Sequence, residues 1–154
     1  MSFSTGVWVT AYARYNLFTA IKHCWGAYIY SDTDSIKLTN HEMFKEYFEN
    51  YNTELLNKIQ KSANHHRFST DLYMPKTIKG VTKVIGAWDY EGTYDRFKTL
   101  GAKRYMTEQN GEYSLTVSGI NKKTAMPYIL KYSDPFTAFD NDLYIPKQYT
   151  GKNI

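Results

Sequence analysis

The first apolar stretch of the chain has the spacing of an amphipathic helix. Residues 7–24 are rich in helix-forming side chains, and Gly26 follows them as a stop signal. The apolar residues near one broad face of this helix are Val7, Ala11, Leu17, Phe18 and Ile21. We predict a helix that ends at about Cys24.

Two short β-prone runs come next, and a polar turn separates them. Residues 27–30 and 35–38 flank residues 31–34, which read Ser-Asp-Thr-Asp. This pattern predicts a β-hairpin with acidic residues at its tip.

A second helical pattern follows the hairpin, at about residues 41–61. Thr39 and Glu42 have the spacing of a capping box, in which each side chain bonds a backbone N–H at the helix start. Apolar residues then recur with helical spacing: Phe44, Tyr47, Phe48, Tyr51, Leu55, Leu56 and Ile59. We predict a long helix here.

The pattern changes to β in residues 76–119. The strand-like stretches are 81–88, 94–100, 102–108 and 112–119. Asn110 and Gly111 form a dipeptide typical of tight hairpin turns. Residues 120–154 are less regular, and prolines separate their short apolar patches. The order helix, hairpin, helix and β-rich tail predicts an α+β fold.

Composition adds a preference for a polyanionic partner. The chain has 19 Lys and Arg against 15 Asp and Glu, which gives a net charge of +4. Its 15 tyrosines, mixed with lysine and arginine, suit stacking on nucleotides, and they equally suit a half-buried sheet. Composition alone leaves both interpretations open.

Cysteine usage and hydropathy indicate the compartment. Cys24 is the single cysteine, so no internal disulfide can form, and no Cys/His cluster has the spacing of a zinc framework. No stretch approaches the ~20 consecutive apolar residues of a membrane helix, and the N-terminal residues do not have the pattern of a secretory signal. We expect a soluble cytoplasmic protein without a membrane partner. We expect Cys24 to be a small buried side chain, and His65 and His66 to be surface residues.

The acidic turn has the residue types of a divalent-metal site. Asp32 and Asp34 are two positions apart on a tight turn, which places their oxygens near one rim of the hairpin. An Asp-Thr-Asp sequence also makes ordinary side-chain turn bonds, so spacing alone favours a structural role. A calcium-binding EF-hand loop is excluded, because Ile36, Lys37 and Met43 stand where it needs an oxygen ligand, a glycine and a glutamate.

Six consecutive residues, Tyr30–Ser35, resemble motif C of family B DNA polymerases, the YxDTDS signature. The preceding TAYAR segment, Thr10–Arg14, resembles the helix ahead of motif C in phage enzymes of the protein-primed branch. Farther on, Lys103–Tyr105 resembles the KxY motif of the same family. The resemblance is strong over residues 10–38 and moderate over residues 85–108.

The resemblance implies a role for each matching residue. Asp34 corresponds to an essential metal ligand, and Asp32 to the neighbouring acidic residue needed for activity. Tyr30 and Thr33 correspond to positions that shape the turn and approach the primer terminus. Lys103 corresponds to the lysine that contacts the primer near its 3′ end.

The segment around the KxY-like motif is basic and aromatic. Arg104 and Tyr105 belong to the motif, and on a strand Lys103 and Tyr105 would share a face while Arg104 points the other way. Further positive charges near the motif are Arg96, Lys98, Lys122 and Lys123. Such residues bind phosphate without reading base sequence, as a polymerase requires.

The activity that the resemblance implies is nucleotidyl transfer. A primer 3′-hydroxyl attacks the α-phosphate of a deoxynucleoside triphosphate, while two Mg²⁺ ions stabilise the attacking and leaving oxygens. Neither the DxxSLYP sequence of motif A nor the KxxxNSxYG sequence of motif B occurs in the chain. We therefore expect a polymerase fragment, inactive alone, in a bacterial host cell. Residues 1–108 would be a partial palm and residues 109–154 a thumb-like subdomain.

The expected partners are primer–template DNA, deoxynucleoside triphosphates and an N-terminal polymerase half. In the family the strands around motif C pair with the strand that bears motif A, so the edge at residues 27–30 would lack a partner strand. We expect self-association through residues 27–38, or coverage of that edge by the N-terminal segment. The alternative function is a non-catalytic DNA-binding module, for which net charge and Lys103–Tyr105 would suffice.

Overall fold

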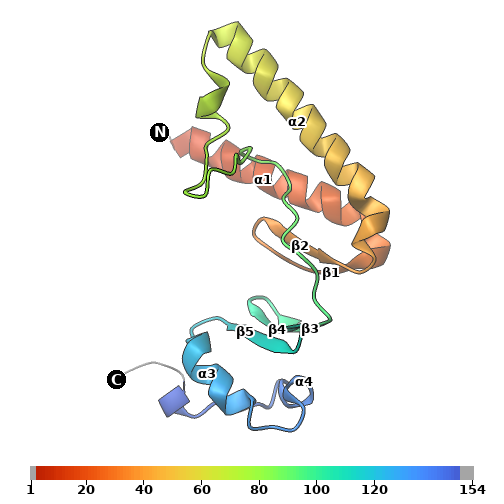
Figure 1. The fold of residues 1–154 in the computed structure, drawn as a ribbon, viewed down its shortest axis with the longest axis vertical. Helices are drawn as coiled ribbons and strands as arrows, with labels where there is room; N and C mark the ends of the chain where they lie inside the picture. Colours follow the sequence, from red (N-terminus) through yellow and green to blue (C-terminus); the bar gives the residue numbers. More distant parts are fainter. Residues whose placement is uncertain (1–2, 150–154) are drawn as a thin grey trace. The chain divides into compact units, whose positions relative to one another are not determined.

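A computed structural model describes residues 3–149 of the 154-residue chain (Figure 1). The chain divides into two compact units, Met1–Tyr90 and Glu91–Ile154. Each unit combines helices with a small antiparallel sheet, which confirms the predicted α+β class. No described helix is both long enough and apolar enough to span a membrane.

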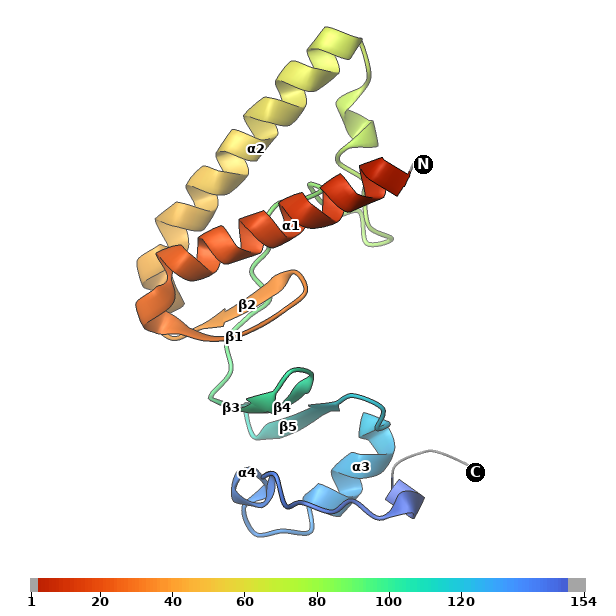
Figure 2. The same ribbon diagram turned by 180° about the vertical axis from the view of Figure 1, so that it is seen from behind.

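The first unit has the predicted order of helix, hairpin and helix. Its regular elements are α1 (Phe3–His23), η1 (Trp25–Ala27), β1 (Tyr28–Asp32), β2 (Ser35–Leu38), η2 (His41–Phe44), α2 (Lys45–His66) and η3 (Thr70–Leu72). The strands β1 and β2 pair only with each other in the described part of the chain. Both long helices meet near the hairpin and diverge from it, as Figures 1 and 2 show.

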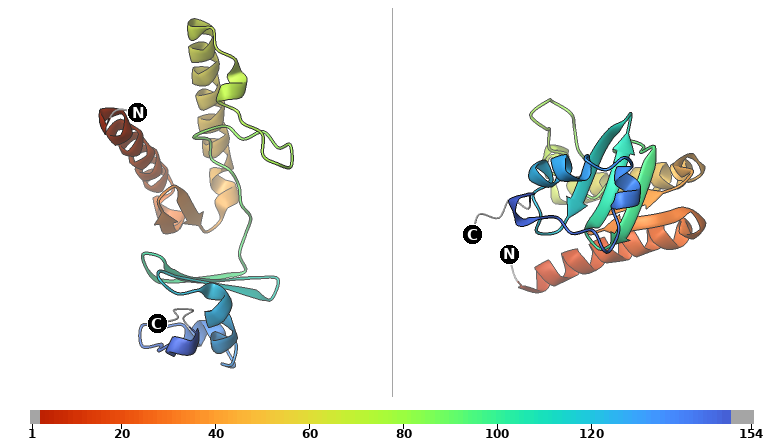
Figure 3. Two further views of the ribbon diagram at one scale, coloured as in Figure 1. Left: turned by 90° about the vertical axis from the view of Figure 1, so that its left-hand side faces the viewer. Right: turned by 90° about the horizontal axis from the view of Figure 1, so that it is seen from below.

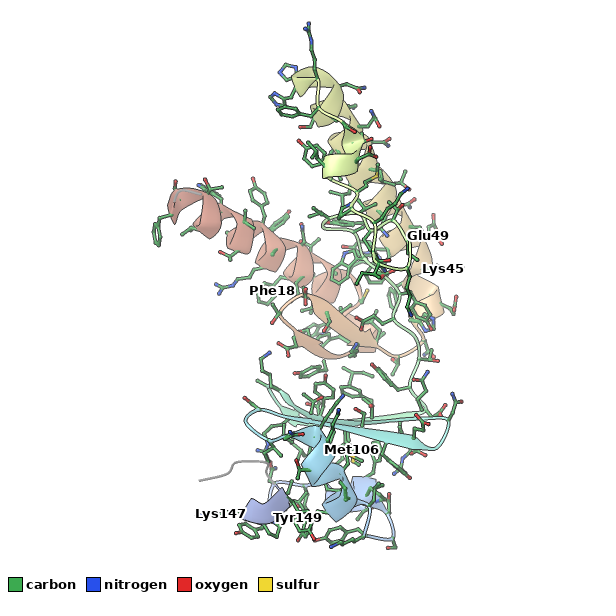
Figure 4. All side chains as sticks on the ribbon, turned by 60° about the vertical axis from the view of Figure 1, so that its left-hand side comes forward. Phe18, Lys45, Glu49, Met106, Lys147 and Tyr149 are labelled. Carbon is green, nitrogen blue, oxygen red and sulfur yellow. The ribbon has the colours of Figure 1, made fainter. Side chains whose placement is uncertain are left out.

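Helix α1 buries a narrower face than its sequence pattern predicts. Leu17, Ala20 and Ile21 are buried, and Cys24 continues this face beyond the helix. Phe18 is 65% exposed and Val7 is 50% exposed, although the spacing places both near the same broad face as Leu17 (Figure 4). Only the C-terminal part of α1 therefore packs into the unit.

The outer side of α1 is unusually apolar for a surface helix. Its exposed large hydrophobic residues are Phe3, Val7, Trp8, Val9, Tyr12, Tyr15 and Phe18. Apolar side chains on nearly all sides explain why the spacing did not identify the buried face: a pattern without a polar stripe does not define one direction.

The start of α2 differs from the predicted capping box. Thr39 donates from its hydroxyl and from its N–H to the carbonyl of Ala27, at 3.4 and 2.9 Å. Glu42 instead lies 2.9 Å from a ring nitrogen of His41. Asn40 adopts a left-handed conformation with φ +47°, and the single 3₁₀ turn η2 leads into α2. The tertiary bond from Thr39 to the hairpin replaces the local cap.

Residues 81–88, predicted as a strand, are irregular apart from one isolated bridge between Lys76 and Thr82. The side-chain amide of Asn52 holds this segment against α2. Its Nδ2 donates to the carbonyl of Trp88 at 2.8 Å, and its Oδ1 accepts from the N–H of Trp88 at 2.8 Å. The indole also meets the rings of Phe48 and Tyr51 edge to face. A side chain therefore satisfies the backbone groups that a neighbouring strand would otherwise bond.

The second unit is a three-stranded antiparallel sheet with helices on one side (Figure 3). Its strands are β3 (Arg96–Gly101), β4 (Arg104–Gln109) and β5 (Glu112–Val117), in that spatial order. Asn110 and Gly111 join β4 to β5 with φ values of +52° and +79°. This confirms the predicted tight hairpin turn, which requires positive φ at both residues.

The core of this unit lies between the sheet and the helices α3 (Lys122–Ile129) and α4 (Pro135–Ala138). Its buried residues are Met106, Leu115, Ala125, Ile129, Phe136 and Phe139. Met106 is fully buried on the helix side of the sheet (Figure 4). The sequence pattern missed α3 because Pro127 lies inside it and suggests a break, although Asn121 provides an N-cap by accepting from the N–H of Lys123 at 3.0 Å.

The structural division of the chain falls between residues 90 and 91. Residues 91–108 therefore belong to the same compact unit as the C-terminal strands. The sequence-based boundary of 108/109 stays a prediction. The names palm and thumb for the two parts stay a prediction.

Replacing Asn52 with alanine should loosen the segment around Trp88. Both backbone groups of Trp88 lose their partners, so local opening of residues 84–90 should become easier by about 1–3 kcal/mol. Hydrogen exchange followed by mass spectrometry measures this directly. Asn57→Ala, an exposed change on the same helix, should leave the exchange of residues 84–90 unchanged. Equal exchange in the two variants would contradict the role of Asn52.

The second unit should lose stability in acid through Asp134, the N-cap of α4. Its carboxylate accepts from the hydroxyl of Thr137 at 2.6 Å and from the N–H of Phe136 at 3.1 Å, and Arg96 lies 3.5 Å away. These contacts, the Thr137 hydroxyl above all, hold the pKa of Asp134 below its ordinary value of 3.8. A lowered folded-state pKa means that the stabilisation is complete above pH ~4 and disappears as the pH falls through the folded-state pKa.

Asp134→Asn keeps a capping oxygen and removes the charge. The variant should therefore be less stable than the parent chain near neutral pH, and the difference should shrink as the pH falls below ~4. Urea unfolding at several pH values measures it, with the exposed Asp142→Asn as the control. A stability difference that does not change with pH would show that the charge of Asp134 is unimportant.

Candidate metal and nucleic-acid site

The two aspartates of the YSDTDS segment lie at the tip of the β1–β2 hairpin. The Cα atoms of Asp32 and Ser35 are paired, which leaves Thr33 and Asp34 as a two-residue loop. The N–H of Asp34 donates to the carbonyl of Asp32 at 2.6 Å, and the hydroxyl of Ser35 donates to the same oxygen at 3.2 Å. These local bonds hold the backbone of the two-residue loop.

Thr33 occupies the left-handed region, with φ +55°. This conformation is costly for a β-branched residue, and glycine or asparagine usually occupies it. The hydroxyl of Thr33 donates to Oδ1 of Asp32 at 2.9 Å, so the strained residue also orients one carboxylate. Asp34 is exposed and Asp32 is half-buried.

The residues around the turn differ in burial. Tyr30 is buried, at 7% exposure, and Ala27 is buried below the hairpin. Ile36 and Leu38 are half-buried, whereas Ile29 is 37% exposed. A bulge between Tyr28 and Tyr30 interrupts the simple alternation along β1.

The donor set at the turn fits a divalent cation in part. Asp32 and Asp34 supply the hard oxygen ligands that Mg²⁺ prefers. Within residues 3–149, however, no group of three or more His, Cys, Asp or Glu side chains could hold a metal ion. A complete site at this turn requires further oxygen ligands from water, a substrate or another polypeptide.

The second predicted site lies at the turn between β3 and β4. Lys103 stands in this turn with φ +54°, and its carbonyl accepts from the N–H of Ser118 at 2.9 Å. Since Lys103 is not on the strand, the prediction that it shares a strand face with Tyr105 was wrong. Arg104 is the first residue of β4, and Gly101 and Val117 are its neighbours on the adjacent strands.

Tyr105 lies on the side of the sheet opposite the core. It alternates along β4 with the buried Met106, and its ring stacks on that of Phe97, with centroids 5.5 Å apart. A groove of about 460 Å³ opens on this side of the sheet. Its lining includes Tyr105, Thr107, Gln109, Ser114, Thr116 and Lys122. A predicted DNA-contacting tyrosine and a lysine from α3 therefore border the same groove.

Two of the nearby basic residues have structural partners. Arg96 lies 3.4 Å from Glu108 and 3.5 Å from Asp134, with its guanidinium 4.2 Å above the ring of Phe136. Lys98 donates to the carbonyl of Phe136 at 2.6 Å. Both side chains hold α4 against the sheet, so they are unsuitable as the phosphate contacts that the sequence suggests.

Lys122 and Lys123 occupy the first turn of α3, which contains no acidic residue. Positive charge there opposes the helix dipole, at a cost of ~0.3–1 kcal/mol for each residue at low salt. A bound polyanion would relieve this repulsion. The sequence pattern did not predict α3. It therefore could not predict that these lysines lie at the positive end of a helix dipole.

The remaining reactive side chains match their predicted places. His65 and His66 are exposed at the end of α2. Cys24 is a free, fully buried cysteine, and burial raises the pKa of its thiol. Burial likewise raises the pKa of Tyr47, whose ring stacks on His23 next to this cysteine.

Comparison with known proteins gives similarity to phage DNA polymerases. The chain is 31% identical over 105 residues to the DNA polymerases of Bacillus phages phi29 and PZA, and 30% identical over 105 residues to that of Bacillus phage Nf. Each match covers 67% of this chain and 13% of the phage enzyme. No family model matches the chain, and no solved structure matches it. The similarity supports the interpretation of this chain as a stretch of a DNA polymerase.

Proposed function

We propose that the chain contributes motif C and a primer-contacting turn to a family B DNA polymerase of the protein-primed phage branch, in a partial palm and the start of a thumb. The observation that carries this proposal is the YSDTDS segment, which forms a tight acidic hairpin tip in a chain similar to phage DNA polymerases. Alone, the chain is proposed to be inactive in primer extension.

Backbone strain supports the assignment of both sites. Within residues 3–149, the non-glycine residues with positive φ are Thr33, Asn40, Arg67, Lys103 and Asn110. Asparagine tolerates this conformation, and Arg67 follows α2 as its C-cap, where left-handed residues are common. Thr33 and Lys103 have neither explanation, and they are the residues that the polymerase resemblance assigns to the active site. Strained residues cluster at functional sites because the surrounding structure must hold them.

In this proposal the carboxylates of Asp32 and Asp34 hold Mg²⁺ at the hairpin tip. Bound there, Mg²⁺ would activate the primer 3′-hydroxyl and stabilise the charge on the transferred phosphate and leaving group. The hydroxyl of Thr33 orients Asp32 by donating to its Oδ1. Lys103 neutralises a primer phosphate, and the ring of Tyr105 packs near the primer sugar or base.

The metal assignment predicts weak binding of Mn²⁺ by the parent chain, which electron paramagnetic resonance measures. Asp34→Asn removes one of two carboxylates and should weaken binding by about tenfold or more, because carboxylate charge dominates the affinity of such sites. Asp71→Asn, an exposed change elsewhere in the first unit, is the control. Equal Mn²⁺ binding by the two variants would exclude the hairpin tip as the metal site.

The primer assignment predicts DNA binding without sequence preference and with steep salt dependence. Lys103→Ala removes one phosphate contact, so the plot of log K against log salt concentration should become shallower by about 0.9 for every sequence. Lys45→Ala, which removes another exposed positive charge, on α2, is the control (Figure 4). Affinity that is identical with chelator and with Mg²⁺ would favour a non-catalytic DNA-binding module.

A further inference from the structure

Residues 75–83 form a small preorganised hairpin outside both predicted sites (Figure 3, left). The N–H of Lys83 donates to the carbonyl of Pro75 at 2.9 Å, and the N–H of Thr77 donates to the carbonyl of Val81 at 2.8 Å. The N–H of Gly80 closes the tip by donating to the carbonyl of Thr77 at 2.8 Å.

Two features fix the conformation of this tip. Gly80 has φ +77°, the left-handed residue that commonly follows a type I turn in a short hairpin. The hydroxyl of Thr77 also accepts from the N–H of Val81 at 3.2 Å. The tip residues Ile78 and Lys79 are therefore presented on a held backbone, which lowers the entropy lost on binding.

The side chain at the outermost position is apolar. Ile78 has a relative exposure of 108%, so it makes almost no contact with the chain. Turn positions usually carry glycine, proline, asparagine, aspartate or serine. An isoleucine there contributes nothing to the packing of the first unit, which points to a contact with another molecule.

The charged residues within the hairpin itself are all positive. Between Asp71 and Asp89 the only charged residues are Lys76, Lys79 and Lys83. Lys83 forms an ion pair with Asp89. In the described part of the chain, no acidic side chain lies within ion-pair distance of Lys76 or Lys79. Two lysines without an acidic partner thus flank a fully exposed isoleucine.

We propose that the 75–83 hairpin binds duplex DNA, with Lys76 and Lys79 on backbone phosphates and Ile78 as an apolar wedge against a base step. Lysines neutralise phosphates without sequence preference. Aliphatic wedges such as isoleucine are used on duplex DNA, where they partly unstack a base step. Single-strand platforms use aromatic rings, and this hairpin has none. The inference rests on the proposed function in one respect: it takes DNA as the binding partner of the chain.

The test uses the full chain and a fluorescein-labelled 20-base-pair duplex in chelator, with anisotropy measured over a series of KCl concentrations. The double variant Lys76→Gln, Lys79→Gln should reduce the slope of log K against log salt concentration by about 1.8, twice the value for one phosphate contact. The matched control is Lys58→Gln, Lys61→Gln, which removes the same charge from the exposed side of α2.

Ile78→Ser should act differently, because the residue carries no charge. Affinity should fall by about fivefold at every salt concentration with the slope unchanged, the effect of leaving about 40 Å² of apolar surface in water. A duplex with 2-aminopurine should brighten when the parent chain binds and much less with Ile78→Ser, since unstacking raises its fluorescence. Met43→Ser, at another exposed apolar residue, is the control.

Any of three results would overturn the proposal: no binding of the duplex by the parent chain, slopes that are equal for the two double-lysine variants, or a larger loss on a single strand than on the duplex. Lys103→Ala in the same titration separates this inference from the proposed function. Loss only with Lys103→Ala overturns the hairpin inference alone. Loss only with the hairpin variants supports the hairpin inference and contradicts the primer role of Lys103.

Discussion

The two hydrogen bonds between the side chain of Asn52 and the backbone of Trp88 complete the first unit. They satisfy the backbone N–H and carbonyl of Trp88, whereas Val81, Lys83 and Ile85 bond the backbone of residues 73–77. Gly86, with φ +84°, stands in the turn closed by the N–H of Ala87 and the carbonyl of Val84 at 3.2 Å, and it brings Trp88 to Asn52. The indole then packs edge to face against the rings of Phe48 and Tyr51 on α2. One amide thus joins a helix predicted from its periodicity to a segment that has no periodicity of its own.

The sequence predicts well the elements whose cause is local. The acidic hairpin, the Asn110–Gly111 turn and the long second helix each follow from residues adjacent in the chain. Predictions failed where tertiary contacts decide. The hydroxyl of Thr39 bonds the hairpin and not the start of α2, and the 81–88 segment bonds a side chain. In α1, apolar residues on nearly every side leave the direction of burial undefined.

In the candidate sites too, features determined by local sequence could be predicted and features determined by tertiary contacts could not. Tyr30–Ser35 is a contiguous string, so its turn could be predicted whole, whereas the backbone conformation of Lys103 could not. Register slips between Thr99 and Gly101, and this irregularity moves Lys103 off the strand into the turn. Arg96 and Lys98 look like free positive charges in the sequence, but they bind α4, a partner visible only in the folded unit.

The rate at which a thiol reagent labels the buried Cys24 reports local opening of the first unit. Thiol reagents attack the thiolate, and a fully buried group with a raised pKa reacts only during moments when its packing opens. Cys24 is the single cysteine of the chain. The labelling rate therefore measures how often the structure opens locally at the end of α1, where the hairpin and α2 meet it. Any molecule that covers the apolar side of α1 and stabilises this junction would lower the labelling rate of Cys24 without contacting the sulfur atom.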